Sequence, residues 1–161
     1  MIRFEKVTKS YSKTDQPALN QVDLNVEKGE FVFLVGLSGS GKSTFLRLVL
    51  REEKPTSGTI HVAGKDLATL SNYKVPELRR QVGTVFQDFR LLNNKTVFEN
   101  VAFALEVIGR PKHVIRQQVP AVLDLVGLSD KEDRFPHQLS GGEQQRVSIA
   151  RAFVNRPLIL L

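Results

Sequence analysis

The chain has 161 residues, of which 41% are hydrophobic and 25% are charged, the proportions of an ordinary soluble globular domain. These values exclude a disordered tail or an acidic solvating segment, and the length predicts one domain with its own core. The sequence has no cysteine, which excludes disulfides, cysteine-based metal sites and a thiol nucleophile. Lysine and arginine exceed aspartate and glutamate by 23 to 17, a net charge of +6. The excess is scattered, which indicates a solvated basic surface.

The first part of the chain has the pattern of strands. Alternating apolar and polar residues predict strands over residues 2–7 and 22–26, with no apolar leader of the secretory kind. Residues 31–35 are apolar throughout and read Phe-Val-Phe-Leu-Val, which predicts a strand buried on both faces. They are far shorter than the ~20 residues of a membrane-spanning helix. A glycine-rich loop follows, and then an amphipathic helix over residues 45–50.

The rest of the chain alternates short strands with helices. Strands are predicted over residues 59–64 and 82–86, and a helix begins near Pro76. Apolar residues at three- and four-residue steps then predict helices over 97–108, 115–126 and 141–155. Pro120 lies within the second of these, so we expect that helix to kink or restart there. Residues 158–161, Leu-Ile-Leu-Leu, have the pattern of the opening of another buried strand.

A phosphate-binding motif occupies residues 36–43, which read Gly-Leu-Ser-Gly-Ser-Gly-Lys-Ser and match G-x-x-x-x-G-K-[ST]. Glycines let successive backbone N–H groups point at phosphate oxygens, and the following helix presents its positive end to the same anion. Lys42 supplies a charge for the β- and γ-phosphates, and Ser43 supplies a hydroxyl for Mg²⁺. The candidate nucleotide-binding residues here are Gly36, Ser38, Gly39, Ser40, Gly41, Lys42, Ser43 and Thr44. The loop alone leaves GTPases, kinases, helicases and transport ATPases open.

A second motif occupies residues 139–146, which read Leu-Ser-Gly-Gly-Glu-Gln-Gln-Arg. Ser140 has the position of a helix N-cap, and Gly141 and Gly142 allow the backbone to approach an anion closely at the start of the helix. A plain capped helix is the alternative interpretation, because Ser140 and Glu143 have capping-box spacing. The candidate nucleotide-binding residues of this motif are Ser140, Gly141, Gly142 and Glu143.

Together the two motifs resemble those of the ATP-binding cassette (ABC) ATPases, whose signature reads LSGGQ or LSGGE followed by QQR. The resemblance implies an α/β fold, a P-loop NTPase core of the ABC ATPase type with an inserted helical subdomain, truncated at the start of the Walker B strand. It implies a single ATP-binding domain over 1–161, incomplete at its C-terminus. Within it, a RecA-like β core is expected over 1–87 and 156–161, and a helical subdomain with the signature over 88–155. It also implies a homodimer that sandwiches ATP and Mg²⁺ between one subunit's phosphate loop and the other's signature.

Two further residues match the family by their positions. Gln87 follows the predicted strand 82–86, as the family's Q-loop glutamine does. The resemblance implies that Gln87 senses Mg²⁺ and the attacking water, so Gln87 and Lys42 are the candidate catalytic residues, and Ser43 and Gln87 the candidate metal-contacting ones. Tyr11 lies just after the first predicted strand, where the family has an aromatic residue that stacks on adenine. Without the two motifs, Gln87 and Tyr11 would be read as ordinary surface residues.

Several stretches resemble one branch of the family in particular, the FtsE subfamily: residues 75–88, 91–92, 96–102 and 150–157. This resemblance implies a cytoplasmic ATP-binding subunit, peripheral on the inner face of the cell membrane, that acts through an FtsX-like integral membrane partner in bacterial cell division and binds no nucleic acid. ATPases for lipoprotein release or amino-acid import share much of the pattern and remain open, as does a non-hydrolysing regulatory module. No long insert follows Gln87, which disfavours the ABC ATPases of DNA repair and translation.

The family's Walker B strand is expected at residues 158–161, where it would run into an aspartate and then a glutamate. The sequence ends at Leu161 before either acid. Phosphoryl transfer depends on the metal and water that these acids position. We therefore expect an ATPase in the intact protein, and a 161-residue chain that binds nucleotide weakly and is nearly inactive in hydrolysis.

Overall fold

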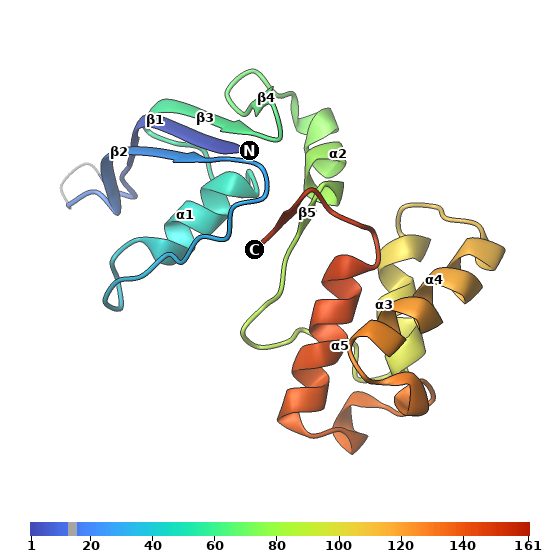
Figure 1. Ribbon diagram of the computed structural model, residues 1–161. Coiled ribbons are helices and arrows are strands. Elements are labelled where there is room, and N and C mark those ends of the chain that lie inside the picture. Colours follow the sequence, from blue (N-terminus) through green and yellow to red (C-terminus); the bar gives the residue numbers. More distant parts are fainter. Residues whose placement is uncertain (13–15) are drawn as a thin grey trace. The chain divides into compact units, whose positions relative to one another are not determined.

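The computed structural model describes residues 1–12 and 16–161. Its chain divides into two compact units, Met1–Gln81 and Val82–Leu161, each with its own sheet and helices (Figure 1). The division into a β core and a helical subdomain at residues 87–88 and 155–156 stays a prediction. Each unit is described below by itself.

A four-stranded antiparallel sheet in the order β2-β1-β3-β4 frames the first unit. Its strands are β1 (Ile2–Lys9), β2 (Leu19–Val26), β3 (Ser57–Val62) and β4 (Lys65–Asp66). Phe4 of β1 is paired with Leu24 on one side and with Ile60 on the other. The strands predicted at 2–7, 22–26 and 59–64 are therefore confirmed, with bounds that differ slightly.

Helix α1 (Lys42–Val49) packs on this sheet through its apolar face. Phe45 stacks on Phe4 of β1, with ring centroids 4.6 Å apart and 24° between the ring planes. Leu48 and Val49 are fully buried in the same core. Burial of apolar side chains of this size contributes about 1.5–3 kcal/mol each. The sheet therefore fixes the helix whose N-terminal end carries the phosphate-binding motif.

Helix α2 (Val75–Arg80) follows a short 3₁₀ turn, η1 (Asn72–Lys74). The helix predicted to begin near Pro76 is therefore confirmed. Arg79 of α2 donates to the carbonyl oxygens of Leu50 and Arg51, at 2.9 and 3.3 Å. These carbonyls lie at the C-terminal end of α1, where a helix leaves its acceptors unpaired. A cation there is also favoured by the helix dipole.

The second unit combines a two-stranded parallel sheet with a helical bundle. Strand β5 (Val82–Gly83) pairs with β6 (Ile159–Leu160), which confirms short strands within the predicted ranges 82–86 and 158–161. The helices are α3 (Val97–Glu106), α4 (Lys112–Leu125) and α5 (Gly141–Phe153), with 3₁₀ turns η2 (Ser129–Lys131) and η3 (Pro136–Gln138) before α5. One shared core includes Val101, Leu105, Leu123, Val147 and Ala150, each almost fully buried.

Helix α4 runs through Pro120 without an interruption. The restart that the proline suggested is therefore wrong, and the alternative of a kink at Pro120 stays a prediction. Val119 and Val122 lie on either side of the proline and are both buried in the shared core. Their packing keeps both halves of the helix on the same surface, which offsets the backbone hydrogen bond that proline removes.

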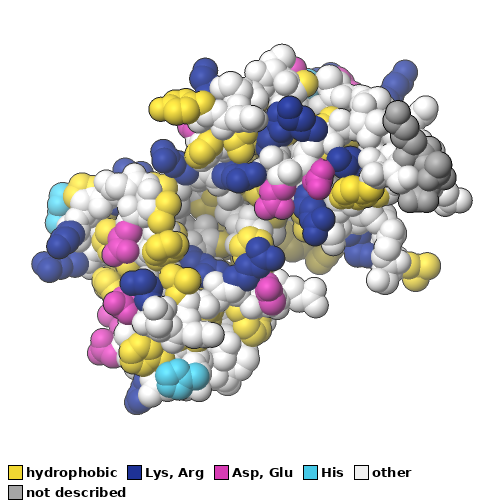
Figure 2. All heavy atoms as spheres, turned by 180° about the vertical axis from the view of Figure 1, so that it is seen from behind, with side chains coloured by type: hydrophobic (Ala, Val, Ile, Leu, Met, Phe, Trp, Pro, Cys, Tyr) yellow, Lys and Arg dark blue, Asp and Glu magenta, His cyan; other side chains and the backbone are white. Residues whose placement is uncertain are grey.

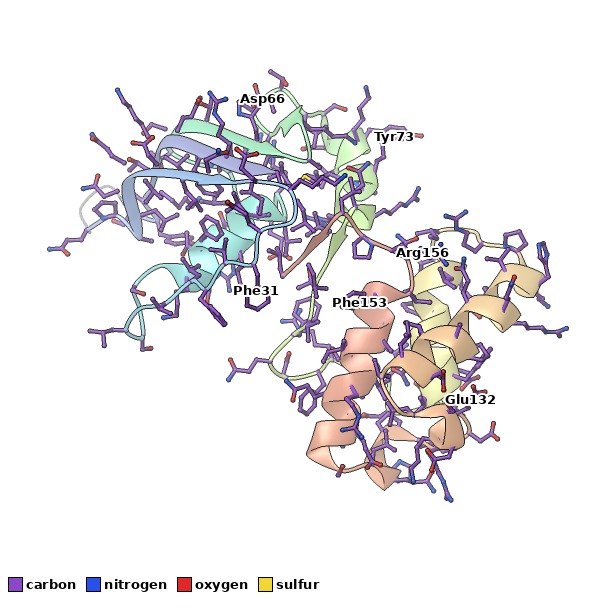
Figure 3. All side chains as sticks on the ribbon, viewed as in Figure 1. Phe31, Asp66, Tyr73, Glu132, Phe153 and Arg156 are labelled. Carbon is purple, nitrogen blue, oxygen red and sulfur yellow. The ribbon has the colours of Figure 1, made fainter. Side chains whose placement is uncertain are left out.

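The strand predicted at residues 31–35 is not present in the described structure. This segment joins β2 to α1 without regular secondary structure, and Phe31, Phe33 and Val35 are 85%, 77% and 83% exposed. Phe31 is labelled in Figure 3. The rings of Phe31 and Phe33 contact each other edge to face, with centroids 4.9 Å apart. A strand requires a neighbour for its backbone hydrogen bonds, and an apolar pattern does not supply one. The prediction of a doubly buried strand is therefore wrong for this structure.

Gly58 provides a test of the first sheet. Its φ is +85°, and an added Cβ would lie 2.4 Å from the carbonyl oxygen of Lys6. Gly58→Ala should therefore destabilise the first unit by about 2–4 kcal/mol, from overpacking against backbone together with the left-handed conformation. Gly64 is the matched control, because its φ is +76° but nothing lies within 4 Å of an added Cβ. Gly64→Ala should cost only about 1 kcal/mol. Urea unfolding followed by circular dichroism measures both, and equal losses would contradict the packing argument.

Candidate nucleotide-binding site

The phosphate-binding motif forms a turn that leads directly into α1. The turn lies at Ser38 and Gly39, and the helix begins at Lys42. Gly39 and Gly41 have φ angles of +81° and +90°, which favour glycine. At Gly41 an added Cβ would also lie 2.3 Å from the carbonyl oxygen of Ala18. The last glycine of the motif is therefore required both by its backbone conformation and by the close approach of the neighbouring chain.

Lys42 lies over the loop that precedes it. Its Nζ donates to the carbonyl oxygens of Gly36 and Leu37, both at 2.7 Å, and lies 3.4 Å from Ser40 Oγ. The ammonium group is therefore held at the loop, close to the N-terminal end of α1. Because a lysine ammonium is a point charge on a flexible stem, it can exchange these carbonyls for phosphate oxygens. Ser43 follows in the first turn of α1 and is exposed.

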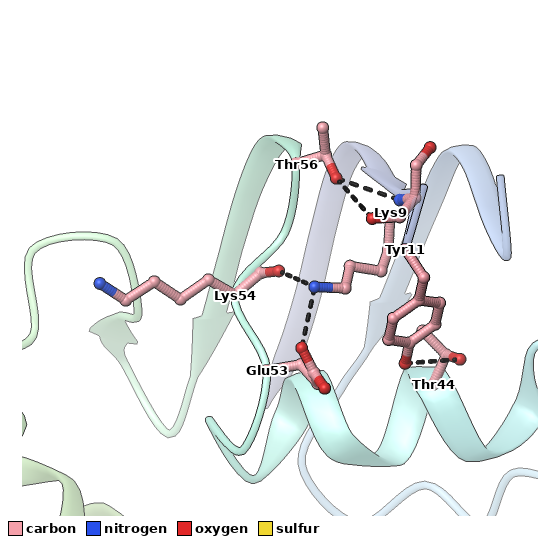
Figure 4. Close-up of polar contacts among 7 residues, drawn as sticks. Lys9, Tyr11, Thr44, Glu53, Lys54 and Thr56 are labelled. Carbon is pink, nitrogen blue, oxygen red and sulfur yellow. Dashed lines mark hydrogen bonds and ion pairs between the residues drawn. The ribbon is translucent and has the colours of Figure 1, made fainter. Parts of the chain in front are cut away.

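The structure brings Tyr11 to the same helix (Figure 4). Tyr11 Oη lies 3.3 Å from Thr44 Oγ1, although these residues are far apart in the sequence. Lys9 Nζ lies 5.0 Å from the centroid of the Tyr11 ring, a cation–π contact, and also pairs with Glu53 Oε2 at 2.8 Å. Tyr11 as a whole is 58% exposed. Tyr11 is thus anchored through its hydroxyl while its aromatic surface remains accessible to a flat ligand.

The second motif begins α5 as a capping box. Ser140 Oγ accepts a hydrogen bond from the Glu143 backbone N–H at 3.3 Å, and Glu143 Oε2 accepts from the Ser140 backbone N–H at 2.8 Å. Ser140 Oγ also donates to Glu143 Oε2 at 2.7 Å. These bonds hold the pKa of Glu143 below its ordinary value. Gly141 and Gly142 are exposed, and nothing lies within 4 Å of a Cβ added to Gly141. The backbone at this helix start is open to a ligand.

The candidate residues fall into two groups. In the first unit, Tyr11 and Lys42 lie on or beside the N-terminal half of α1. In the second unit, the exposed Gln87 follows β5, and Ser140 begins α5. The structure therefore assembles the phosphate loop with Tyr11, and it separately orders the Gln87 segment and the signature.

Sequence reasoning missed one residue beside the Gln87 segment. Arg151 of α5 donates to the carbonyl oxygens of Phe89 and Arg90, at 2.7 and 2.6 Å. Arg151 is only partly exposed, and burial lowers its pKa from the ordinary value. No local pattern in the sequence marks this residue, because its two acceptors lie about sixty residues earlier in the chain.

Metal binding depends on which oxygen donors the chain offers. Among the described residues, no group of three or more acidic or histidine side chains could hold an ion by itself. The Ser43 hydroxyl and the Gln87 amide are hard oxygen donors of the kind that Mg²⁺ accepts. Either donor by itself suits a Mg²⁺ ion that is bound mainly by the phosphates of a nucleotide.

Figure 2 shows one face of the molecule with its side chains coloured by type. Lysine and arginine side chains are spread over this face and interspersed with acidic and apolar ones. Across the part of the chain that the structure describes, no helix has the length and apolar character needed to cross a membrane.

Comparison with known proteins places these motifs in one family. A family model described as ABC transporter matches residues 19–161. The cell division ATP-binding protein FtsE of Mycobacterium tuberculosis is 58% identical to the chain, and that of Bacillus subtilis is 55% identical. FtsE of Escherichia coli K12 is 52% identical. All three similarities extend over the whole chain, which covers 70%, 70% and 72% of these relatives. The predicted resemblance to the FtsE subfamily is confirmed.

Solved structures lead to the same conclusion about the fold. The chain is similar to the dimeric ATP-binding cassette MJ0796 bound to ADP and phosphate, with a TM-score of 0.87 and 36% identity over 99% of this chain and 72% of that one. It is also similar to cbiO1 from Clostridium perfringens, with a TM-score of 0.89 and 30% identity over 99% of this chain and 63% of that one. The α/β fold of the ABC ATPase type is therefore confirmed. By its motifs, its fold and its matched residues, the chain belongs to the ABC transporter family.

Proposed function

We propose that this protein is the ATP-binding subunit of an FtsE-like complex in bacterial cell division, and that it binds Mg²⁺-ATP through its phosphate loop. The observation that carries this proposal is the position of Lys42, whose ammonium lies over the loop at the N-terminal end of α1. The 50–58% identity to FtsE proteins supports the cellular role. ATPase activity is typical of the ABC family.

Each part of the nucleotide has a proposed contact. Backbone N–H groups of the loop and the Lys42 ammonium bind the phosphates, because both present positive charge at the start of α1. The exposed Tyr11 ring stacks on the adenine. Ser43 Oγ contributes one ligand to a Mg²⁺ ion held by the phosphates, and the Gln87 amide orients the attacking water.

A second copy of the chain completes the proposed site. Ser140, Gly141 and Gly142 of one subunit contact the γ-phosphate that the other subunit's loop holds. The open backbone at the start of α5 supports this role, since a helix N-terminus attracts anions. The solved MJ0796 cassette, which is dimeric, supports the assembly.

An integral membrane protein of the FtsX type is the proposed partner, with the complex on the cytoplasmic face of the cell membrane. The identity to FtsE proteins supports this choice over the lipoprotein-release and amino-acid import systems. In such a complex the nucleotide-driven association of two subunits is the event that the membrane partner transmits.

Removing the loop's charge tests the central proposal. Lys42→Ala should weaken Mg²⁺-ATP binding by roughly 100-fold, because a charge-assisted contact to phosphate is worth up to about 3 kcal/mol. Lys112→Ala is the control, since Lys112 is an exposed lysine at the start of α4. Its affinity should equal that of the parent. Fluorescence titration with a labelled ATP measures both, and an unchanged affinity in Lys42→Ala would rule out binding at this loop.

Two substitutions of Tyr11 separate stacking from its hydrogen bond to Thr44. Tyr11→Phe keeps the ring, so its ATP affinity should stay within about twofold of the parent. Tyr11→Ala removes the ring and should weaken binding by roughly 10-fold, the low end of what base–aromatic stacking contributes. Tyr73→Ala is the control, because Tyr73 is 94% exposed (Figure 3). If Tyr11→Phe lost as much affinity as Tyr11→Ala, the hydroxyl and not the ring would be the functional group.

Ser140 is tested against the alternative that it only caps α5. Ser140→Ala should raise the pKa of Glu143 toward its ordinary value, since Ser140 provides the bonds that lower it. Because the folded-state pKa of Glu143 is lowered, its ionised carboxylate stabilises α5 fully at pH values above the ordinary glutamate pKa. This stabilisation is lost as the pH falls through the folded-state pKa. NMR titration of Glu143 measures this shift.

The same variant should also abolish ATP-dependent dimerisation in analytical ultracentrifugation. Thr96→Ala is the matched control, because Thr96 forms the same capping box with Glu99 at the start of α3. Each change should cost about 1 kcal/mol of cap stabilisation, but only Ser140→Ala should prevent the dimer. A dimer that persists in Ser140→Ala would leave Ser140 as a plain cap.

A further inference from the structure

The residues that follow Gln87 form a tight turn in an unfavourable backbone conformation. The Phe89 N–H donates to the Phe86 carbonyl at 3.1 Å, and the Arg90 N–H donates to the Asp88 carbonyl at 2.6 Å. Phe89 and Arg90 have φ angles of +56° and +49°, so two consecutive residues with side chains are left-handed. Such conformations persist where surrounding contacts hold them.

Arg151 of α5 provides that contact. Its Nη2 donates to the Phe89 carbonyl at 2.7 Å, and its Nη1 donates to the Arg90 carbonyl at 2.6 Å. Both acceptors belong to the left-handed residues. A planar guanidinium has several donors in a fixed fork, so it can bind two neighbouring carbonyls at once, whereas a lysine ammonium is a single point charge. The Arg90 side chain contacts the start of the turn, with its guanidinium 4.2 Å from the Phe86 ring centroid.

The next part of the segment is held by α3. Asn100 is fully buried, and its amide donates to the carbonyls of Leu92, Lys95 and Thr96 at 2.9–3.1 Å. Its Oδ1 accepts from the Leu92 N–H at 2.7 Å. Helices α3 and α5 share one apolar core. The segment from residue 89 to residue 96 is therefore attached at both ends to the same helical bundle.

We propose that Arg151 is a positioning residue that fixes Gln87 relative to the signature helix. Ser140 caps the start of α5 and Arg151 lies in its last turn, so one rigid helix connects the signature to the Gln87 turn. Any rotation of α5 then moves Gln87 with it. The roles of Gln87 and Ser140 in this inference rest on the proposed function, but the connection itself is a property of the second unit.

The chain has no cysteine, so pairs of spin labels can be placed without background. Labels at Gln87→Cys and Gln145→Cys, both exposed positions of the second unit, report the distance between the turn and α5 by double electron–electron resonance. With Arg151 present the distance distribution should be narrow. Arg151→Met should broaden it at least twofold while the helical circular dichroism is unchanged. Arg151→Lys should give an intermediate width, because the ammonium can bond one carbonyl but lacks the fork.

Arg116→Met is the matched control, since Arg116 is an exposed arginine of α4 in the same unit. Its distribution should equal that of the parent. An unchanged width in Arg151→Met, or equal broadening in Arg116→Met, would overturn the inference. If Arg151→Met loses its helical circular dichroism, the Arg151→Lys variant is used in its place. A label distance distribution broader than the parent's then supports the inference, and an identical distribution overturns it.

ATP titration of the unlabelled parent chain and of Arg151→Met, both with Gln87 and Gln145 intact, separates this inference from the proposed function. Arg151→Met should retain the parent's ATP affinity within about twofold, because the phosphate loop lies in the first unit. A parent chain that binds no ATP would contradict the proposed function, whereas the label distances would still report whether Arg151 holds the turn.

Discussion

The stacking of Phe45 on Phe4 is the contact on which the nucleotide site depends. It fixes α1 on the sheet, and α1 in turn sets the direction of the N–H groups at its start and the position of Lys42. Arg79 satisfies carbonyls at the other end of the helix. The helix dipole favours a cation such as Arg79 at the C-terminal end of α1, and it favours the phosphate that we propose to bind at the N-terminal end.

In the second unit, side-chain hydrogen bonds to backbone carbonyls hold an irregular segment, whereas in the first unit an aromatic stack holds a helix. Arg151 and Asn100 bind backbone carbonyls of one irregular segment, and both lie on helices that share a core. Buried backbone groups in a loop need partners, and side chains provide them where no strand is available. The irregular segment that follows Gln87 is therefore joined by side-chain hydrogen bonds to both α3 and α5.

The comparison of sequence and structure is instructive at residues 31–35 and at Pro120. Both predictions rested on local pattern. The apolar run 31–35 lacks a paired neighbour and is exposed, because strand formation depends on the partner's backbone. Helix α4 continues through Pro120 because flanking valines are buried in a core that the proline does not interrupt. At residues 31–35 the partner strand that the pattern needs is missing, and at Pro120 packing in the core outweighed the local preference.

The sequence by itself determined the family, the phosphate loop and the capped signature helix, because these depend on residue types at fixed short spacing. Glycines, a lysine and a serine in eight consecutive positions encode a phosphate loop wherever a helix follows. Only the tertiary structure decided that Tyr11 meets Thr44, that Gly41 lies against Ala18, and that Arg151 holds the Gln87 turn. These contacts join residues far apart in the chain, and their geometry is set by how the sheet and the helices pack rather than by any local pattern.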